Sequence, residues 1–161
     1  MRDYEDCRPY IEHLASEHRR LHEMIRQVRF AVVHSCGADR DATAADIIAV
    51  LSRMRGELAH HFRDEEQGGC MDEAVSHCPR LSADVQRIEL EHAEMLARLD
   101  ALVVAAADIE KSVRQRVEFE ADFDNFCRQV NAHEAAENAI LRDAFGYNVN
   151  GDNGAALVMI E

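Results

Sequence analysis

Apolar residues recur every three or four positions along four long stretches of the chain, a spacing that places side chains on one face of an α-helix. The stretches cover roughly residues 10–36, 42–67, 80–106 and 109–145. Glycine and proline fall mainly outside them, and no stretch shows the alternation that is typical of a β-strand. The pattern therefore predicts an all-α fold, arranged as an antiparallel up-down four-helix bundle.

The apolar face of each stretch contains a histidine. The first two faces consist of Ile11, Leu14, His18, Leu21, Ile25, Val28 and Val32, and of Ile47, Leu51, Met54, Leu58, His61 and Glu65. The other two consist of Leu81, Val85, Ile88, His92, Met95, Leu99 and Leu102, and of Phe123, Phe126, Val130, His133, Glu137 and Ile140. The polar residues predicted to point into the bundle are therefore His18, His61, Glu65, His92, His133 and Glu137.

Four imidazoles and two carboxylates inside an apolar core require a partner. Left unpaired, such groups cost several kcal/mol to bury, and a bound metal cation removes that cost. Mixed imidazole and carboxylate ligands suit iron, manganese or zinc, and the absence of cysteine from the inward set argues against a thiolate site. Two carboxylates among six ligands suit a pair of ions that share them as bridges.

The inward residues lie in short motifs. These are Glu17-His18, His61-Phe62-Arg63-Asp64-Glu65-Glu66, Glu91-His92 and His133-Glu134-Ala135-Ala136-Glu137. With these motifs, the chain resembles the hemerythrin-like (HHE cation-binding) proteins over residues 10–145. These proteins are four-helix bundles with a non-haem di-iron centre.

The resemblance implies a cofactor of two iron ions, Fe2+ or Fe3+, and a role for each inward residue. His18, His61, His92 and His133 would be terminal ligands, and Glu65 and Glu137 would bridge the ions. Six protein donors do not fill two octahedra. Room is left for an oxo or hydroxo bridge or for a ligand from solution.

One position departs from the oxygen-carrying members of that family, which place a second histidine one turn after the ligand on the third helix. Here that position holds Leu96. His22 lies one turn after His18, and the first and third helices of an up-down bundle run parallel, so His22 is expected near the level of Leu96. We therefore include His22 as a candidate seventh metal ligand, with a place at the edge of the bundle as the alternative.

A rival di-iron pattern is also present. The strings Glu57-Leu58-Ala59-His60 and Glu89-Leu90-Glu91-His92 have the Glu-x-x-His spacing of ferritin-like proteins. Glu57 and His60 lie off the apolar face, and the ferritin-like motif belongs on the second and fourth helices rather than the second and third. The pattern therefore favours the hemerythrin-like reading, and His60 and Asp64 are predicted to be solvated.

Length and charge narrow the class of protein further. The 161 residues suit one domain, with residues 1–145 as the bundle and 146–161 as a C-terminal tail. The net charge of −13 disfavours binding to nucleic acid or to an anionic membrane. The chain lacks an apolar run of membrane-spanning length and a signal-peptide layout at its start, which predicts a cytoplasmic protein. Five cysteines, an odd number, fit reduced thiols in that compartment.

The expected function is binding of a small ligand such as O2, nitric oxide or peroxide at an open iron position; the resemblance implies this class of ligand. No nucleophilic triad, phosphate-binding loop or inward tyrosine accompanies the site, so binding is expected rather than catalysis. Two alternatives stay open. One is an iron buffer or sensor whose metal loading is read by a protein partner, and the other is a metal-free helical interaction module, which the inward carboxylates disfavour.

Overall fold

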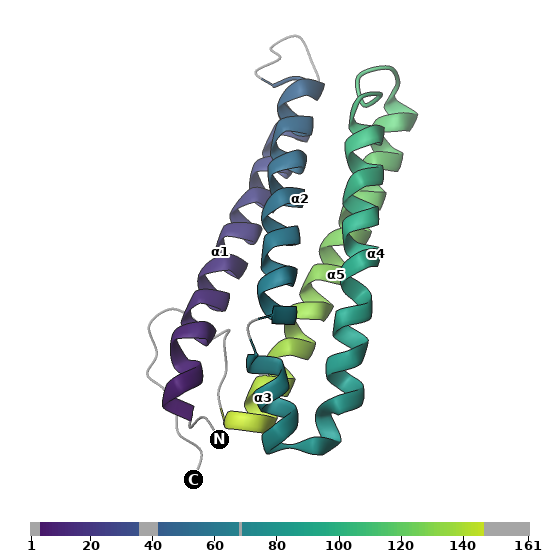
Figure 1. The fold of residues 1–161 in the computed structure, drawn as a ribbon. Coiled ribbons are helices and arrows are strands. Elements are labelled where there is room, and N and C mark those ends of the chain that lie inside the picture. The colour runs from purple at the N-terminus through teal and green to yellow at the C-terminus, as the bar shows by residue number, and fades with distance from the viewer. Residues whose placement is uncertain (1–3, 36–41, 68, 147–161) are drawn as a thin grey trace.

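The computed structural model describes residues 4–35, 42–67 and 69–146, and nearly all of them are helical. The elements are α1 (Tyr4–His34), α2 (Ala44–Gln67), α3 (Cys70–His77), a single 3-10 turn (Pro79–Leu81), α4 (Ser82–Ala106) and α5 (Val113–Phe145). Figure 1 shows the four long helices side by side, with the short α3 at the end where α2 leads into α4. The prediction of an all-α fold is confirmed.

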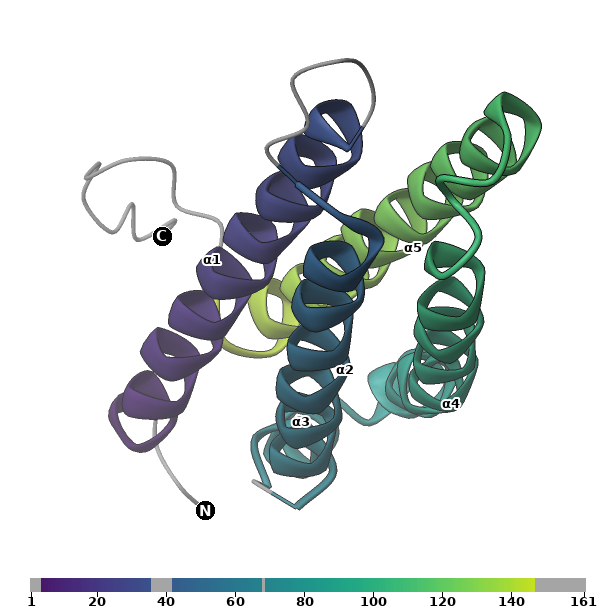
Figure 2. The same cartoon turned by 90° about the horizontal axis from the view of Figure 1, so that it is seen from above.

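The apolar faces predicted from the sequence form the interior. Every residue assigned to the four faces is buried, with an exposed fraction of 8 % or less. Seen from above, the long helices follow one another around the bundle in the order α1, α2, α4, α5 (Figure 2), and each packs against the next. The helices therefore form because each one covers the apolar face of its neighbours.

The helix boundaries differ from the predicted ones most at the starts of α1 and α5. Helix α1 begins six residues earlier than predicted, and α5 begins at Val113 with Ser112 as its N-cap, since the Ser112 hydroxyl accepts a hydrogen bond from the backbone N–H of Gln115 at 3.2 Å. The segment predicted as a break contains α3, which is anchored by buried Cys70 and Met71.

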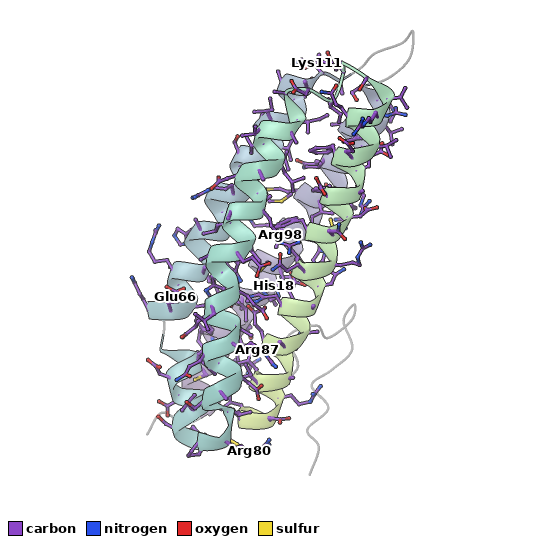
Figure 3. All side chains as sticks on the ribbon, turned by 90° about the vertical axis from the view of Figure 1, so that its right-hand side faces the viewer. His18, Glu66, Arg80, Arg87, Arg98 and Lys111 are labelled. Atoms are coloured by element: carbon purple, nitrogen blue, oxygen red, sulfur yellow. The ribbon has the colours of Figure 1, made fainter. Side chains whose placement is uncertain are left out.

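The interior is divided by a polar layer. A large apolar cluster fills the bundle from the layer to the end where α4 turns into α5, and two smaller clusters fill the opposite end. His18 lies between Leu14 of a small cluster and Leu21 of the large one. On α4 and α5, His92 and His133 likewise lie between residues of a small cluster and of the large one. Figure 3 shows His18 inside the bundle, far from both ends.

Two further expectations concern the ends and the surface. Helix α5 ends at Phe145 and is capped by Gly146, whose φ of 69° is left-handed. The rest of the predicted tail, residues 147–161, lies outside the described residues. Within the described residues, no helix combines the length and the apolar character needed to cross a membrane.

Candidate metal centre

The six inward residues predicted from the sequence meet in the polar layer. They form two groups, and in each group one ligand atom per residue lies within 4.8 Å of the others. One group consists of His18, His61, Glu65 and Glu137, and the other consists of Glu65, His92, His133 and Glu137. All six are buried, and Glu137 has no exposed surface. The two groups thus share both carboxylates.

The shared carboxylates each face both groups. Glu137 Oε2 lies 3.1 Å from His18 Nε2, and Oε1 lies 2.8 Å from His133 Nε2. Glu65 Oε1 lies 3.4 Å from His61 Nε2, and Oε2 lies 3.2 Å from His92 Nε2. Each carboxylate therefore presents one oxygen to each pair of histidines.

The atoms that converge here are close together without being hydrogen-bonded. Both oxygens of Glu65, both oxygens of Glu137 and the Nε2 atoms of His18, His92 and His133 are buried and have no hydrogen-bond partner. The short distances above bring these atoms toward common points rather than into N–H···O alignment. Unpaired buried polar atoms are costly, so the donor set fits a bound cation.

The pKa values of the two buried carboxyls are shifted in opposite directions. Burial and the nearby charge of Glu137 raise the pKa of Glu65 well above its usual range. Burial also acts to raise the pKa of Glu137, but His133 and His18 outweigh it and hold that pKa well below its usual range. Without a cation, proton binding is therefore favoured at Glu65 and disfavoured at Glu137.

Three further glutamates orient the histidines. The Nδ1–H groups of His61, His92 and His133 donate hydrogen bonds to Glu17 at 2.7 Å, Glu66 at 2.8 Å and Glu91 at 2.9 Å, respectively. These bonds fix the ring orientation and leave Nε2 free to bind a metal. Each glutamate comes from the helix that precedes its histidine around the bundle. A glutamate of α1 orients a histidine of α2, one of α2 orients a histidine of α4, and one of α4 orients a histidine of α5.

The fourth corner of the layer is built differently. By the same rule Glu134 of α5 would orient His18 of α1, but its Oε2 instead accepts a hydrogen bond from His22 Nε2 at 2.8 Å. The Nδ1 atom of His18 is buried without a partner, as is Oε1 of Glu134. His22 is not a member of either metal-compatible group among the described residues. The structure thus pairs His22 with Glu134 beside the site.

The expectation that no tyrosine points inward is wrong. The hydroxyl of Tyr10 is buried without a hydrogen-bond partner, and its pKa is raised by burial and by the charges of Glu65 and Glu137. Tyr10 lies four residues before the inward residue Leu14 and eight before His18, so periodicity places it on the apolar face. Its side chain is long enough to bring the hydroxyl near the centre from that position.

The two Glu-x-x-His strings do not form a ferritin-like site. Glu57 forms an ion pair with Arg20 at 2.6 Å, and His60 is exposed, which leaves no ferritin-like site on α2. Among the described residues, no metal-compatible group contains a cysteine.

The comparison with known families agrees with this geometry. Residues 10–145 match the hemerythrin HHE cation binding domain, and the chain belongs to this family of cation-binding helical domains. No curated protein and no solved structure matches the chain.

Proposed function

We propose that this protein is an antiparallel four-helix bundle that holds two iron ions and binds a small ligand such as O2, nitric oxide or peroxide. His18 and His61 would bind one ion, His92 and His133 the other, and Glu65 and Glu137 would bridge them. The observation that carries this proposal is that each bridging carboxylate faces both histidine pairs with one oxygen. When bound, iron supplies an open coordination position and a change between Fe2+ and Fe3+.

The arrangement of donors supports a ligand from solution. Two imidazoles and two carboxylate oxygens give each ion four protein donors, fewer than the six of an octahedron. His22 is not one of the proposed ligands, because its Nε2 atom forms a hydrogen bond with Glu134.

A small cavity beside one histidine pair supports a ligand of diatomic size. It has a volume of ≈ 20 Å³ and is lined by Glu17, His18, Leu21, Met24, Glu57, Leu58 and His61. A cavity of about this size holds a water molecule or a diatomic ligand, whereas pockets for organic substrates are many times larger. Its apolar wall, made by Leu21, Met24 and Leu58, suits an uncharged ligand.

The test is metal analysis of protein purified without oxygen, followed by absorption spectra before and after air is admitted. We expect about two iron ions per chain and a change in the spectrum on exposure to oxygen. Replacing the buried ligand in His61→Ala should lose iron, whereas its exposed neighbour in His60→Ala should keep it. Stoichiometric zinc that iron cannot replace, or equal losses in the two variants, would contradict the proposal.

A second candidate function is iron buffering or sensing, in which metal loading is read by a protein partner. It is favoured by the burial of Glu65 and Glu137, because a loss of cation must change the stability of the bundle. Metal-dependent stability without any spectral response to oxygen, nitric oxide or peroxide would favour this function over the first.

A further inference from the structure

A second set of histidines and carboxylates lies on the surface between α1 and α2. Each helix contributes a histidine and a carboxylate four residues apart, His13 with Glu17 and His60 with Asp64. This spacing places both side chains on one face of a helix, as it does for the buried pair His61 and Glu65. His60 and Asp64 each precede a member of that buried pair by one residue, and one residue turns a side chain about 100° around the helix axis.

The distances within this outer cluster suit a single ion. His13 Nε2 lies 3.2 Å from Glu17 Oε1 and 3.9 Å from Asp64 Oδ2, and one ligand atom from each of these three residues lies within 4.8 Å of the others. Metal bonds of about 2.0–2.2 Å to nitrogen and oxygen place neighbouring ligand atoms roughly 3–4 Å apart. His60 Nδ1 lies 3.0 Å from Asp64 Oδ2, so it is able to orient that carboxylate.

We propose that His13, Glu17 and Asp64 bind a divalent first-row transition ion, such as Zn2+ or Fe2+, at the surface of the bundle. An imidazole with two carboxylates favours such ions over Mg2+ and Ca2+, which prefer oxygen ligands alone. The side chains of His13 and Asp64 are 55 % and 39 % exposed, so water completes the coordination. The net charge of −13 raises the local concentration of cations around the site.

Glu17 connects this outer site to the buried centre. Its Oε1 faces His13, and its Oε2 accepts the hydrogen bond from the Nδ1–H of His61. An ion at the outer site would therefore bind the same Glu17 carboxylate that orients His61 at the inner site. Glu17 itself is unsuitable as a test position, because its replacement disturbs both sites.

The test is a zinc titration of the untagged, iron-loaded chain in excess Mg2+, with zinc and iron counted by equilibrium dialysis and elemental analysis. Wild type should bind one zinc ion in addition to its iron. His13→Ala and Asp64→Asn should each weaken that binding at least about tenfold while iron is retained, and His60→Ala should weaken it less. The matched control is His77→Ala, because His77 and Glu73 on α3 also form a pair four residues apart, at 3.4 Å, but belong to no metal-compatible group within the part of the chain that the structure describes.

Four results would overturn the proposal: no zinc beyond the iron, zinc uptake matched by iron loss, unchanged zinc binding in His13→Ala, or an equal loss in His77→Ala. Failure of the outer site is distinguished from failure of the buried one with His133→Ala, which removes a ligand of the inner centre only. That variant should lose iron and still bind zinc in a manner that depends on His13.

Discussion

The interior has two parts that lie on the same four helices and are built on opposite principles. In the large apolar cluster, inward positions hold residues such as Leu51, Met54, Leu99 and Phe126, none of which is exposed. In the polar layer, the same periodic positions hold histidine and glutamate. Apolar side chains are stabilised by burial alone, whereas buried imidazoles and carboxylates need hydrogen bonds or a cation. The apolar cluster therefore stabilises the folded bundle, whereas burial of the polar layer destabilises it unless a metal is bound.

The largest effect that separates the two parts is expected from removing the metal. Chelation should lower the melting temperature by about 10 °C or more, because Glu65 and Glu137 are left as buried carboxyls without a cation. Thermal unfolding followed by circular dichroism measures the shift, and adding the metal back should reverse it. Equal melting temperatures with and without metal would mean that the layer is satisfied by water.

A substitution in the apolar cluster should act without regard to metal. Phe126→Ala is expected to lower the free energy of unfolding by about 3–5 kcal/mol in both the metal-loaded and the metal-free protein. Val117→Ala is the control, because Val117 lies on the same helix but is 52 % exposed. Denaturant unfolding of both forms measures the difference. A cost that changes strongly when the metal is removed would show that the two parts are coupled.

Within the polar layer, the orienting glutamates should affect metal affinity more than stability. Glu91→Gln weakens the hydrogen bond to His133 Nδ1 and should lower metal affinity about 10–100-fold, as measured by competition with a chelator. Glu94→Gln should have no effect, because Glu94 pairs with exposed Arg98 on the same helix. Similar affinities for the two variants would mean that the packing of His133 alone holds its ring.

The smallest effect is expected from pH in the metal-free protein. The pKa of Glu65 is raised by burial and by Glu137, so between its ordinary value and the raised value the folded chain binds more protons than the unfolded chain. Stability from this group is therefore present at low pH and is lost as pH rises toward the raised pKa. Glu65→Gln removes this dependence, and its stability advantage over wild type should shrink by up to about 1.4 kcal/mol per unit as pH falls. A constant difference would contradict the assigned direction.

The sequence was sufficient to predict the six inward residues, because helical periodicity determines which side chains share a face. Thr43 and Asp46, three residues apart as in a capping box, exchange hydrogen bonds at the start of α2. Helix α3 was missed because Cys70–His77 is only two turns long, too short for periodicity to emerge between the flanking glycine and proline.

Helical periodicity does not predict the glutamates that hydrogen-bond to the inward histidines. Glu17, Glu66 and Glu91 act on histidines of the next helix, and such pairs depend on how neighbouring helices are rotated and shifted relative to one another. The same limit applies to His22, whose neighbour Glu134 belongs to α5. Tyr10 was missed for another reason. Its spacing of four residues from Leu14 continues the apolar face, but the predicted face was begun at Ile11.

The bonds from Glu17, Glu66 and Glu91 also determine the axial stagger of the helices. Apolar faces that repeat every three or four residues mesh almost as well after one helix slides by a turn, a movement of about 5.4 Å. Hydrogen bonds of 2.7, 2.8 and 2.9 Å between α1 and α2, α2 and α4, and α4 and α5 do not survive such a slide. The glutamates beside the inward histidines thus favour one alignment among those that the repeating apolar faces allow.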